Sequence, residues 1–247
     1  MQGCATNDPK PCPIRGVCRI TDIRQEIKDY NQEVVKNQLP CALEICPRCK
    51  QKSNAFKRHD VRQRHLAVIV DRLIIKVMAW MVRMKCSLCG KTFTDYPQFA
   101  LPYKRFVSLE IMDRSLRYLQ DDTMTYEQAA CEQDPGQANG RSPPRQPMPV
   151  FHEDPGKAGR LAPSTVARWI TTLGSLQNTL QAAMALLLER GTDMHRQAFD
   201  VAAHKYRSQE RKRLLQDCLM LFHADARYRL LFDHSIFPQL AIRYGWQ

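Results

Sequence analysis

The sequence lacks the apolar segments that a secreted or membrane-spanning protein needs. Its first eight residues are polar, without the apolar run of a secretory signal. The most apolar stretch, residues 66–82, is interrupted by Asp71, Arg72 and Lys76, so it is unsuited to cross a bilayer. We therefore expect a cytoplasmic protein with no membrane partner, whose ten cysteines stay reduced.

Acidic residues are scarce in one part of the chain. Residues 46–107 contain 14 Lys and Arg but only 3 Asp and Glu, and they carry nearly all of the formal net charge of +12. Such a concentration of like charge repels itself unless a polyanion neutralises it, although a solvated surface is the alternative. We interpret the segment as binding nucleic acid, and the expected phosphate contacts are Lys57, Arg58, Arg62 and Arg64.

Aromatic residues are also rare in this basic segment. Phe56 is the single aromatic residue between Lys50 and Arg64. Proteins that hold single strands stack bases on aromatic side chains, so their scarcity favours contacts with the backbone of a duplex. Double-stranded DNA is therefore the expected partner.

Two Cys-x-x-Cys pairs bracket the basic segment. Cys46 and Cys49 form the first pair, and Cys86 and Cys89 form the second after 36 intervening residues. Each such turn aims two thiolates at one point, and two turns complete the tetrahedral set that Zn²⁺ accepts. Two unrelated pairs of buried thiols, or redox pairs near a βαβ unit, are the alternatives. The spacing predicts a Cys4 zinc ribbon.

Four cysteines near the N-terminus have less regular spacing. They are Cys4, Cys12, Cys18 and Cys41, and prolines separate them. They could form a second metal site, but free thiols are the simpler interpretation.

The fold class we predict is α+β, with an antiparallel zinc ribbon followed by a mostly helical region. Residues 1–40 would form an arm and a short helix over 21–38, and residues 41–102 the ribbon. Within the ribbon, residues 55–85 read as β-structure, and 91–97 as the strand that returns from the second cysteine pair.

Residues 103–175 have the pattern of a helix-turn-helix, and a plain helical bundle in which Trp169 and Arg168 merely pack is the alternative. We expect a helix over 108–120 capped by Ser108, and a second one that starts at Thr125, with Gln128 completing a capping box. A loop rich in proline and glycine, 132–162, precedes a third helix capped by Ser164. Its core face would be Val166, Trp169, Ile170 and Leu173, and its outward residues Ser164, Thr165 and Arg168 would contact DNA.

The C-terminal region, 176–247, reads as further helices with apolar stripes. One stripe comprises Leu214, Leu215, Cys218, Leu219 and Phe222. We expect these helices to serve homodimerisation or partner docking, with packing in the core as the alternative.

The order of these parts resembles the front half of bacterial insertion-sequence transposases, and stand-alone zinc-ribbon proteins of mobile elements. The resemblance rests on the cysteine pairs, on "RMKCSLCGKTFTDYPQFALPYKR", and on "MTYEQAA" and "APSTVARWI". It implies that Cys46, Cys49, Cys86 and Cys89 bind zinc, and that the helix at Ser164 recognises DNA. Such transposases continue into a catalytic domain with three metal-binding carboxylates, whereas the 72 residues after Ser175 here read as helices.

We therefore expect a zinc-dependent DNA-binding protein without catalytic function. It would recognise the ends or the target site of a mobile genetic element and act with a separate recombinase or ATPase. A transcription regulator with the same DNA-binding parts, a component of an RNA-guided ribonucleoprotein, and a metal-dependent nuclease are the alternatives.

Overall fold

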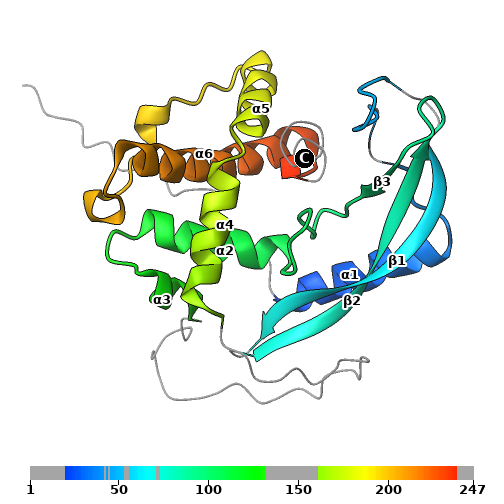
Figure 1. Ribbon diagram of the computed structural model, residues 1–247, viewed down its shortest axis with the longest axis horizontal. Coiled ribbons are helices and arrows are strands. Elements are labelled where there is room, and N and C mark those ends of the chain that lie inside the picture. Colours follow the sequence, from blue (N-terminus) through cyan, green and yellow to red (C-terminus); the bar gives the residue numbers. More distant parts are fainter. Residues whose placement is uncertain are drawn as a thin grey trace, which may run out of the picture.

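The computed structural model describes residues 20–41, 43, 45–52, 56–70, 73–131 and 161–237. Within these residues a three-stranded antiparallel sheet precedes a region of helices, which confirms the predicted α+β class (Figure 1). Most of the predicted loop, 132–160, lies outside the described residues. Among the helices that the structure describes, none combines the length and the apolar character that a membrane span requires.

A long β-hairpin forms the frame of the ribbon. Strand β1 (Phe56–Val70) pairs with β2 (Leu73–Cys86) along its whole length, and β3 (Thr92–Asp95) pairs with the last part of β2. The β-structure predicted over 55–85 is confirmed at 56–70 and 73–85, and the return strand predicted over 91–97 is confirmed at Thr92–Asp95. Since β3 is short, it leaves most of the outer edge of β2 without a strand partner.

Helix α1 (Ile20–Val35) packs against β2 and protects this edge. Its apolar face buries Ile23, Ile27 and Val34. The side chain of Asn31 donates to the carbonyl of Met78 at 3.0 Å and accepts from the backbone N–H of Trp80 at 2.9 Å. One amide side chain therefore satisfies both backbone groups that a fourth strand would have paired there.

The opposite edge of the hairpin is joined to the helical region. The N–H of Ala67 in β1 donates to the carbonyl of Arg105 at 2.6 Å, and the N–H of Val107 donates to the carbonyl of Ala67 at 3.2 Å. The next outward N–H of β1, that of Ile69, donates to the Glu110 carboxylate at 3.0 Å. Residues 105–110 thus fix where the first helix of the helical region begins.

Three helices of the predicted helix-turn-helix pack against one another. They are α2 (Ser108–Gln120), α3 (Tyr126–Ala130) and α4 (Pro163–Gly174). The capping box is confirmed, because the Thr125 hydroxyl accepts from the N–H of Gln128 while the Gln128 side chain accepts from the N–H of Thr125.

The two predicted serine caps are wrong. The N-cap of α2 is Val107, and the Ser108 hydroxyl donates instead to the carbonyl of Gln98. The N-cap of α4 is Ala162, because Pro163 occupies the first helical turn, where its missing N–H costs nothing. Ser164 therefore lies inside the helix, one residue beyond that proline.

Helices α5 (Gln177–Glu189) and α6 (Gln209–Phe232) complete the core around α4, with two short 3-10 turns at Arg196–Ala198 and Ala203–Lys205 between them. Gly174 ends α4 against α6, where an added Cβ would lie 2.3 Å from the carbonyl oxygen of Leu214. Most of the predicted apolar stripe of α6 is buried in this core, namely Leu215, Cys218, Leu219 and Phe222. The stripe is used within the chain, and homodimerisation stays a prediction.

Candidate metal centre and nucleic-acid interface

The two cysteine pairs adopt the same backbone turn. In the first, the N–H of Cys46 donates to the carbonyl of Gln51 and the N–H of Lys50 donates to the carbonyl of Cys46. In the second, the same bonds join Cys86 to Lys91 and Gly90 to Cys86. The fifth residue of each turn has a positive φ, 60° at Lys50 and 68° at Gly90.

These matched turns bring the four sulfur atoms together. All four lie within 4.8 Å of one another, with 3.8 Å from Cys46 Sγ to Cys89 Sγ and 4.0 Å from Cys49 Sγ to Cys86 Sγ. A tetrahedron of sulfurs about 2.3 Å from a central Zn²⁺ has edges of about 3.8 Å. The predicted cysteines are thus placed so that they could hold one metal ion.

Burial and hydrogen bonding act differently on the cysteines of the centre. Cys46 and Cys86, the first of each pair, are fully buried, whereas Cys49 and Cys89 are half-buried. Burial raises the pKa of Cys46 to about 11, and the backbone N–H of Cys89 lowers the pKa of Cys86 to about 7. Cys86 is therefore the more readily ionised of the two, and the thiolate is the form that binds metals.

The predicted second metal site falls largely outside the described residues. Cys4, Cys12 and Cys18 lie there, and Cys41 is half-buried, with its pKa raised to about 12 by burial. In the parts of the chain that the structure describes, the cluster of Cys46, Cys49, Cys86 and Cys89 is the one group of three or more potential ligands placed to share an ion.

The four basic residues predicted on β1 have different surroundings. Lys57 is exposed and lies directly opposite Lys85 of β2, so two like charges are paired across the strands. Arg62 is exposed and forms an ion pair of 3.0 Å with Asp60. Arg58 instead donates to the carbonyl of Val34 and to Asn37, which ties the end of α1 to the hairpin.

Arg64 and Lys104 connect the hairpin to α4. Arg64 Nη2 donates to the carbonyl of Lys104 at 2.7 Å, and Lys104 Nζ donates to the hydroxyl of Thr172 at 3.0 Å. Burial, and next the nearby guanidinium of Arg168, lower the pKa of Lys104. The structure therefore brings together cations from β1, from the loop before α2 and from α4.

The core and outward faces of α4 are those predicted. Val166, Trp169, Ile170 and Leu173 are buried, and Trp169 contacts Phe106 edge-to-face at 5.0 Å. Ser164 and Arg168 are exposed, and Thr165 is half-buried. Arg168 lies over the first turn of its own helix, where Nε donates to the carbonyl of Ser164 at 3.3 Å.

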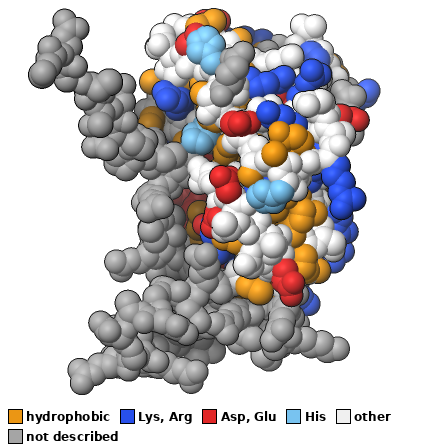
Figure 2. All heavy atoms as spheres, turned by 90° about the vertical axis from the view of Figure 1, so that its left-hand side faces the viewer, with side chains coloured by type: hydrophobic (Ala, Val, Ile, Leu, Met, Phe, Trp, Pro, Cys, Tyr) orange, Lys and Arg blue, Asp and Glu red, His pale blue; other side chains and the backbone are white. Residues whose placement is uncertain are grey.

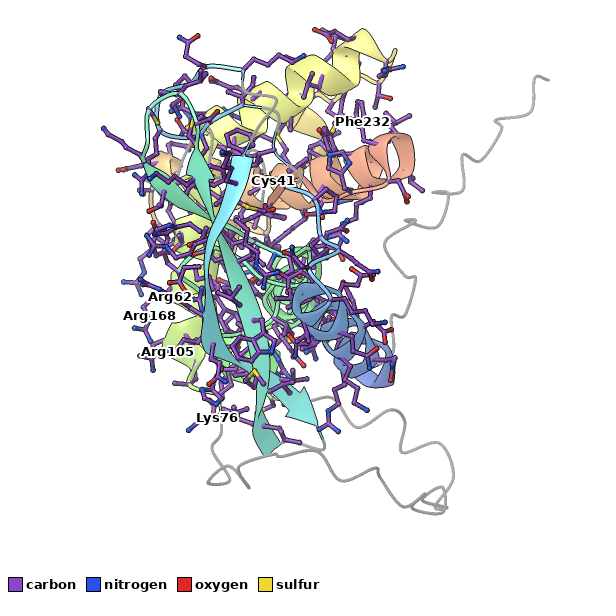
Figure 3. All side chains as sticks on the ribbon, turned by 90° about the vertical axis from the view of Figure 1, so that its right-hand side faces the viewer. Cys41, Arg62, Lys76, Arg105, Arg168 and Phe232 are labelled. Carbon is purple, nitrogen blue, oxygen red and sulfur yellow. The ribbon has the colours of Figure 1, made fainter. Side chains whose placement is uncertain are left out.

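Arg62, Arg168, Arg105 and Lys76 follow one another along one side of the molecule, which we term the basic edge (Figure 3). All four side chains are exposed. Two of them, Arg62 on β1 and Arg168 on α4, were predicted from the sequence. Arg105 and Lys76 were missed, although the adjacent basic residues 104 and 105 were a signal that could have indicated the first.

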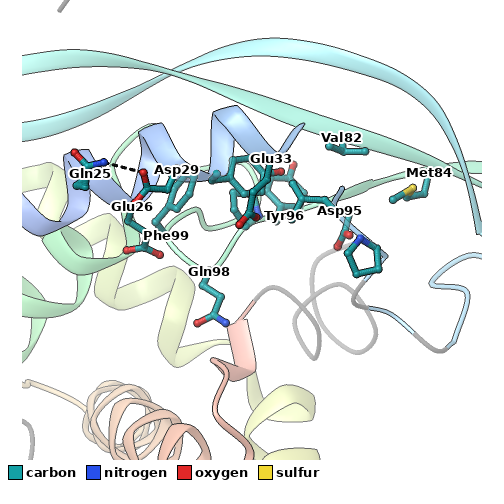
Figure 4. Close-up of a pocket in the computed structure, with 14 residues that line it drawn as sticks. Gln25, Glu26, Asp29, Glu33, Val82, Met84, Asp95, Tyr96, Gln98 and Phe99 are labelled. Carbon is teal, nitrogen blue, oxygen red and sulfur yellow. Dashed lines mark hydrogen bonds between the residues drawn. The ribbon is translucent and has the colours of Figure 1, made fainter. Parts of the chain in front are cut away.

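A groove beside α1 is lined by acidic side chains. It has a volume of about 680 Å³ and runs between α1 and the segment from β3 to Phe99 (Figure 4). Four carboxylates line it, those of Glu26, Asp29, Glu33 and Asp95, beside the rings of Tyr30 and Phe99. Phosphate would be repelled here, so the basic edge is the better surface for a polyanion.

The helical region presents a mixed surface on the side that Figure 2 shows. Acidic, basic and apolar side chains are interspersed there. Three of the carboxylates after α5 have local partners. Asp217 accepts from Arg196 at 2.5 Å, Asp225 pairs with Arg229 at 2.8 Å, and Asp200 pairs with Lys212 at 3.3 Å. Each of these three carboxylates is therefore paired with a neighbouring cation.

Comparison with known proteins finds one family model that matches part of this chain. Residues 46–133 match the model of a family described as a domain of unknown function, DUF6431. The match begins at the first cysteine of the metal centre and ends just after α3, so it includes both cysteine turns, the hairpin and α2. No curated protein and no solved structure matches the chain.

Proposed function

We propose that the protein is a zinc-bound, double-stranded-DNA-binding protein that uses the basic edge to contact the phosphate backbone. The observation that carries the proposal is the convergence of Arg62, Arg105 and Arg168 on one side of the molecule. They come from a strand, a loop and a helix, so the fold itself assembles a positive surface. The regularly spaced phosphates of a duplex could contact several of these cations at once.

The metal has a structural role in this proposal. It would hold the two cysteine turns together at the end of the hairpin where β2 ends and β3 begins. A set of four thiolates with tetrahedral spacing suits Zn²⁺ or an iron–sulfur centre, and zinc fits a small ribbon. Metal analysis of the purified protein should find one zinc per chain, and a Cys46→Ser/Cys86→Ser variant should retain none.

Recognition of sequence is assigned to α4. Arg168 is exposed near the first turn of that helix, and Ser164 and Thr165 lie beside it. In a helix-turn-helix these positions reach base edges and flanking phosphates. A role at the ends or target site of a mobile element, with a separate recombinase or ATPase, is the biological setting that we propose, and catalysis is not part of it.

The test is the salt dependence of binding to a duplex. An Arg105→Gln/Arg168→Gln variant should bind more weakly than the wild type, and its slope of log affinity against log salt should fall by about 0.9 for each lost phosphate contact. The matched control is Lys28→Gln/Lys36→Gln, which removes the same charge from one residue in α1 and one residue directly after it.

Because both double variants lose the same charge, the control shows whether binding depends on the basic edge or only on the net charge of the protein. Equal losses in both double variants would indicate that binding follows net charge alone. A wild type that binds no duplex at low salt would refute the proposed function.

A further inference from the structure

An exposed tyrosine sits at the tip of a tight turn beside the basic edge. The N–H of Lys104 donates to the carbonyl of Leu101 at 3.2 Å, which closes a four-residue turn with Pro102 and Tyr103 in its centre. Leu101 and Pro102 are buried and anchor the turn, whereas the Tyr103 side chain is 74% exposed. The phenol ring is therefore directed away from the core.

The backbone of Tyr103 has an uncommon conformation for its residue type. Its φ is 60°, and it follows a proline in a turn closed by a hydrogen bond from the fourth residue to the first. This is the third position of a type II turn, where glycine or asparagine avoids the clash of a side chain with the backbone. A bulky residue held in this region indicates a constraint other than stability.

The neighbours of Tyr103 indicate which partner its ring would meet. Arg105, two residues on, is part of the basic edge, and Lys104 binds Thr172 of α4. An aromatic ring that extends from a surface able to hold phosphates is suited to stack on a nucleobase.

We propose that Tyr103 stacks on a base of the bound nucleic acid, with Arg105 holding the adjacent phosphate. This inference rests on the proposed function and specifies the substrate. A base in an intact duplex must first leave its stack, which is unfavourable, whereas an unpaired base is already available. The protein should therefore prefer a duplex that contains one unpaired base over the same duplex fully paired.

The experiment compares these two duplexes with the full-length, zinc-bound protein. The wild type should bind the duplex with the unpaired base about tenfold more tightly. Tyr103→Phe keeps the ring and should keep this preference. Tyr103→Asn removes the ring but suits the positive φ, so it should lose the preference while its melting temperature does not fall.

Two further readouts make the outcome specific to stacking. When 2-aminopurine replaces the unpaired base, its fluorescence should be quenched by the wild type and Tyr103→Phe, but not by Tyr103→Asn. Arg105→Gln should weaken binding to both duplexes alike and leave the preference unchanged.

Each result decides between the two proposals. If the wild type binds both duplexes equally, or if Tyr103→Asn keeps the preference, stacking is refuted while duplex binding stands. If the wild type binds neither duplex, the proposed function fails, and the role of Tyr103 fails with it.

Discussion

Glu110 and Arg114 form a buried ion pair at the junction between the ribbon and the helices, with 3.2 Å between Oε2 and Nε. The other oxygen of Glu110 accepts from the N–H of Ile69 at the end of β1. Arg114 Nη1 donates to the carbonyls of Ala129, Ala130 and Cys131 at the C-terminal end of α3. One pair on α2 therefore holds the hairpin on one side and α3 on the other.

Arg114→Met should be strongly destabilising, because it leaves the Glu110 carboxylate buried without its counter-ion and three carbonyls without a donor. We expect the free energy of unfolding to fall by about 3–5 kcal/mol, measured by urea denaturation. Asp113→Asn is the matched control, since the exposed Asp113 pairs with the half-buried Arg117 on the same helix. It should cost less than about 1 kcal/mol. Similar losses in the two variants would contradict the role given to the buried pair.

Asn31→Ala should weaken the packing of α1 on the hairpin. The substitution leaves the carbonyl of Met78 and the N–H of Trp80 without the partner that they share. We expect a loss of about 1–3 kcal/mol in the free energy of unfolding. Gln25→Ala on the same helix removes only an exposed bond to Asp29, and should change stability by less than about 0.5 kcal/mol. An Asn31→Ala protein as stable as the control would show that water replaces the amide.

The two cysteine turns predict opposite effects of substitutions at equivalent positions. Gly90→Ala places a side chain at a φ of 68°, and since no atom lies within 4 Å of the new Cβ, the cost is conformational, about 1 kcal/mol. Lys50→Gly relieves the same conformation in the other turn and should stabilise the zinc-bound protein by about 0.5–1 kcal/mol. Thermal melts of the two variants should shift in opposite directions, and shifts of the same sign would be inconsistent with matched turns.

Stability should depend on pH through His223 in α6. Burial, and next the charge of Arg227, lower the pKa of His223, and its ring lies 4.9 Å from that of Phe199. The native state therefore binds fewer protons than the unfolded state as the pH falls below about 6.5. The free energy of unfolding should accordingly rise with pH on the acidic side of about 6.5. In His223→Gln the free energy of unfolding should change less with pH. An unchanged slope would show that other groups cause the pH dependence.

The cysteine spacing and the hairpin could be predicted because short-range rules determine them. Two Cys-x-x-Cys turns need the same few backbone bonds wherever they occur, and the structure forms them in both pairs. The serine caps failed because α4 already begins at Pro163, one residue before Ser164, and because Val107 takes the N-cap position of α2. Sequence rules rank cap residues but do not settle which neighbour takes the position.

The junction and the turn at Tyr103 could not be predicted, because they depend on contacts between distant residues. Glu110 and Arg114 have the spacing of an ordinary exposed helical pair. They are buried because Glu110 contacts Ile69 of β1, which lies 41 residues away in the sequence. A tyrosine at a position that favours glycine contradicts turn preferences, so a sequence pattern would not have indicated it. The basic edge includes Arg168, which only the packing of α4 near the hairpin brings to the side of Arg62 and Arg105.

The most direct test of the account is the affinity for duplex DNA in one preparation before zinc removal, after chelation and after one equivalent of zinc is restored. Without the metal, the cysteine turns and β3 should lose their order, and the hairpin should no longer hold the basic edge in place. We predict that affinity falls at least tenfold on chelation and recovers with zinc. The same affinity in all three states would contradict a zinc-stabilised DNA-binding surface.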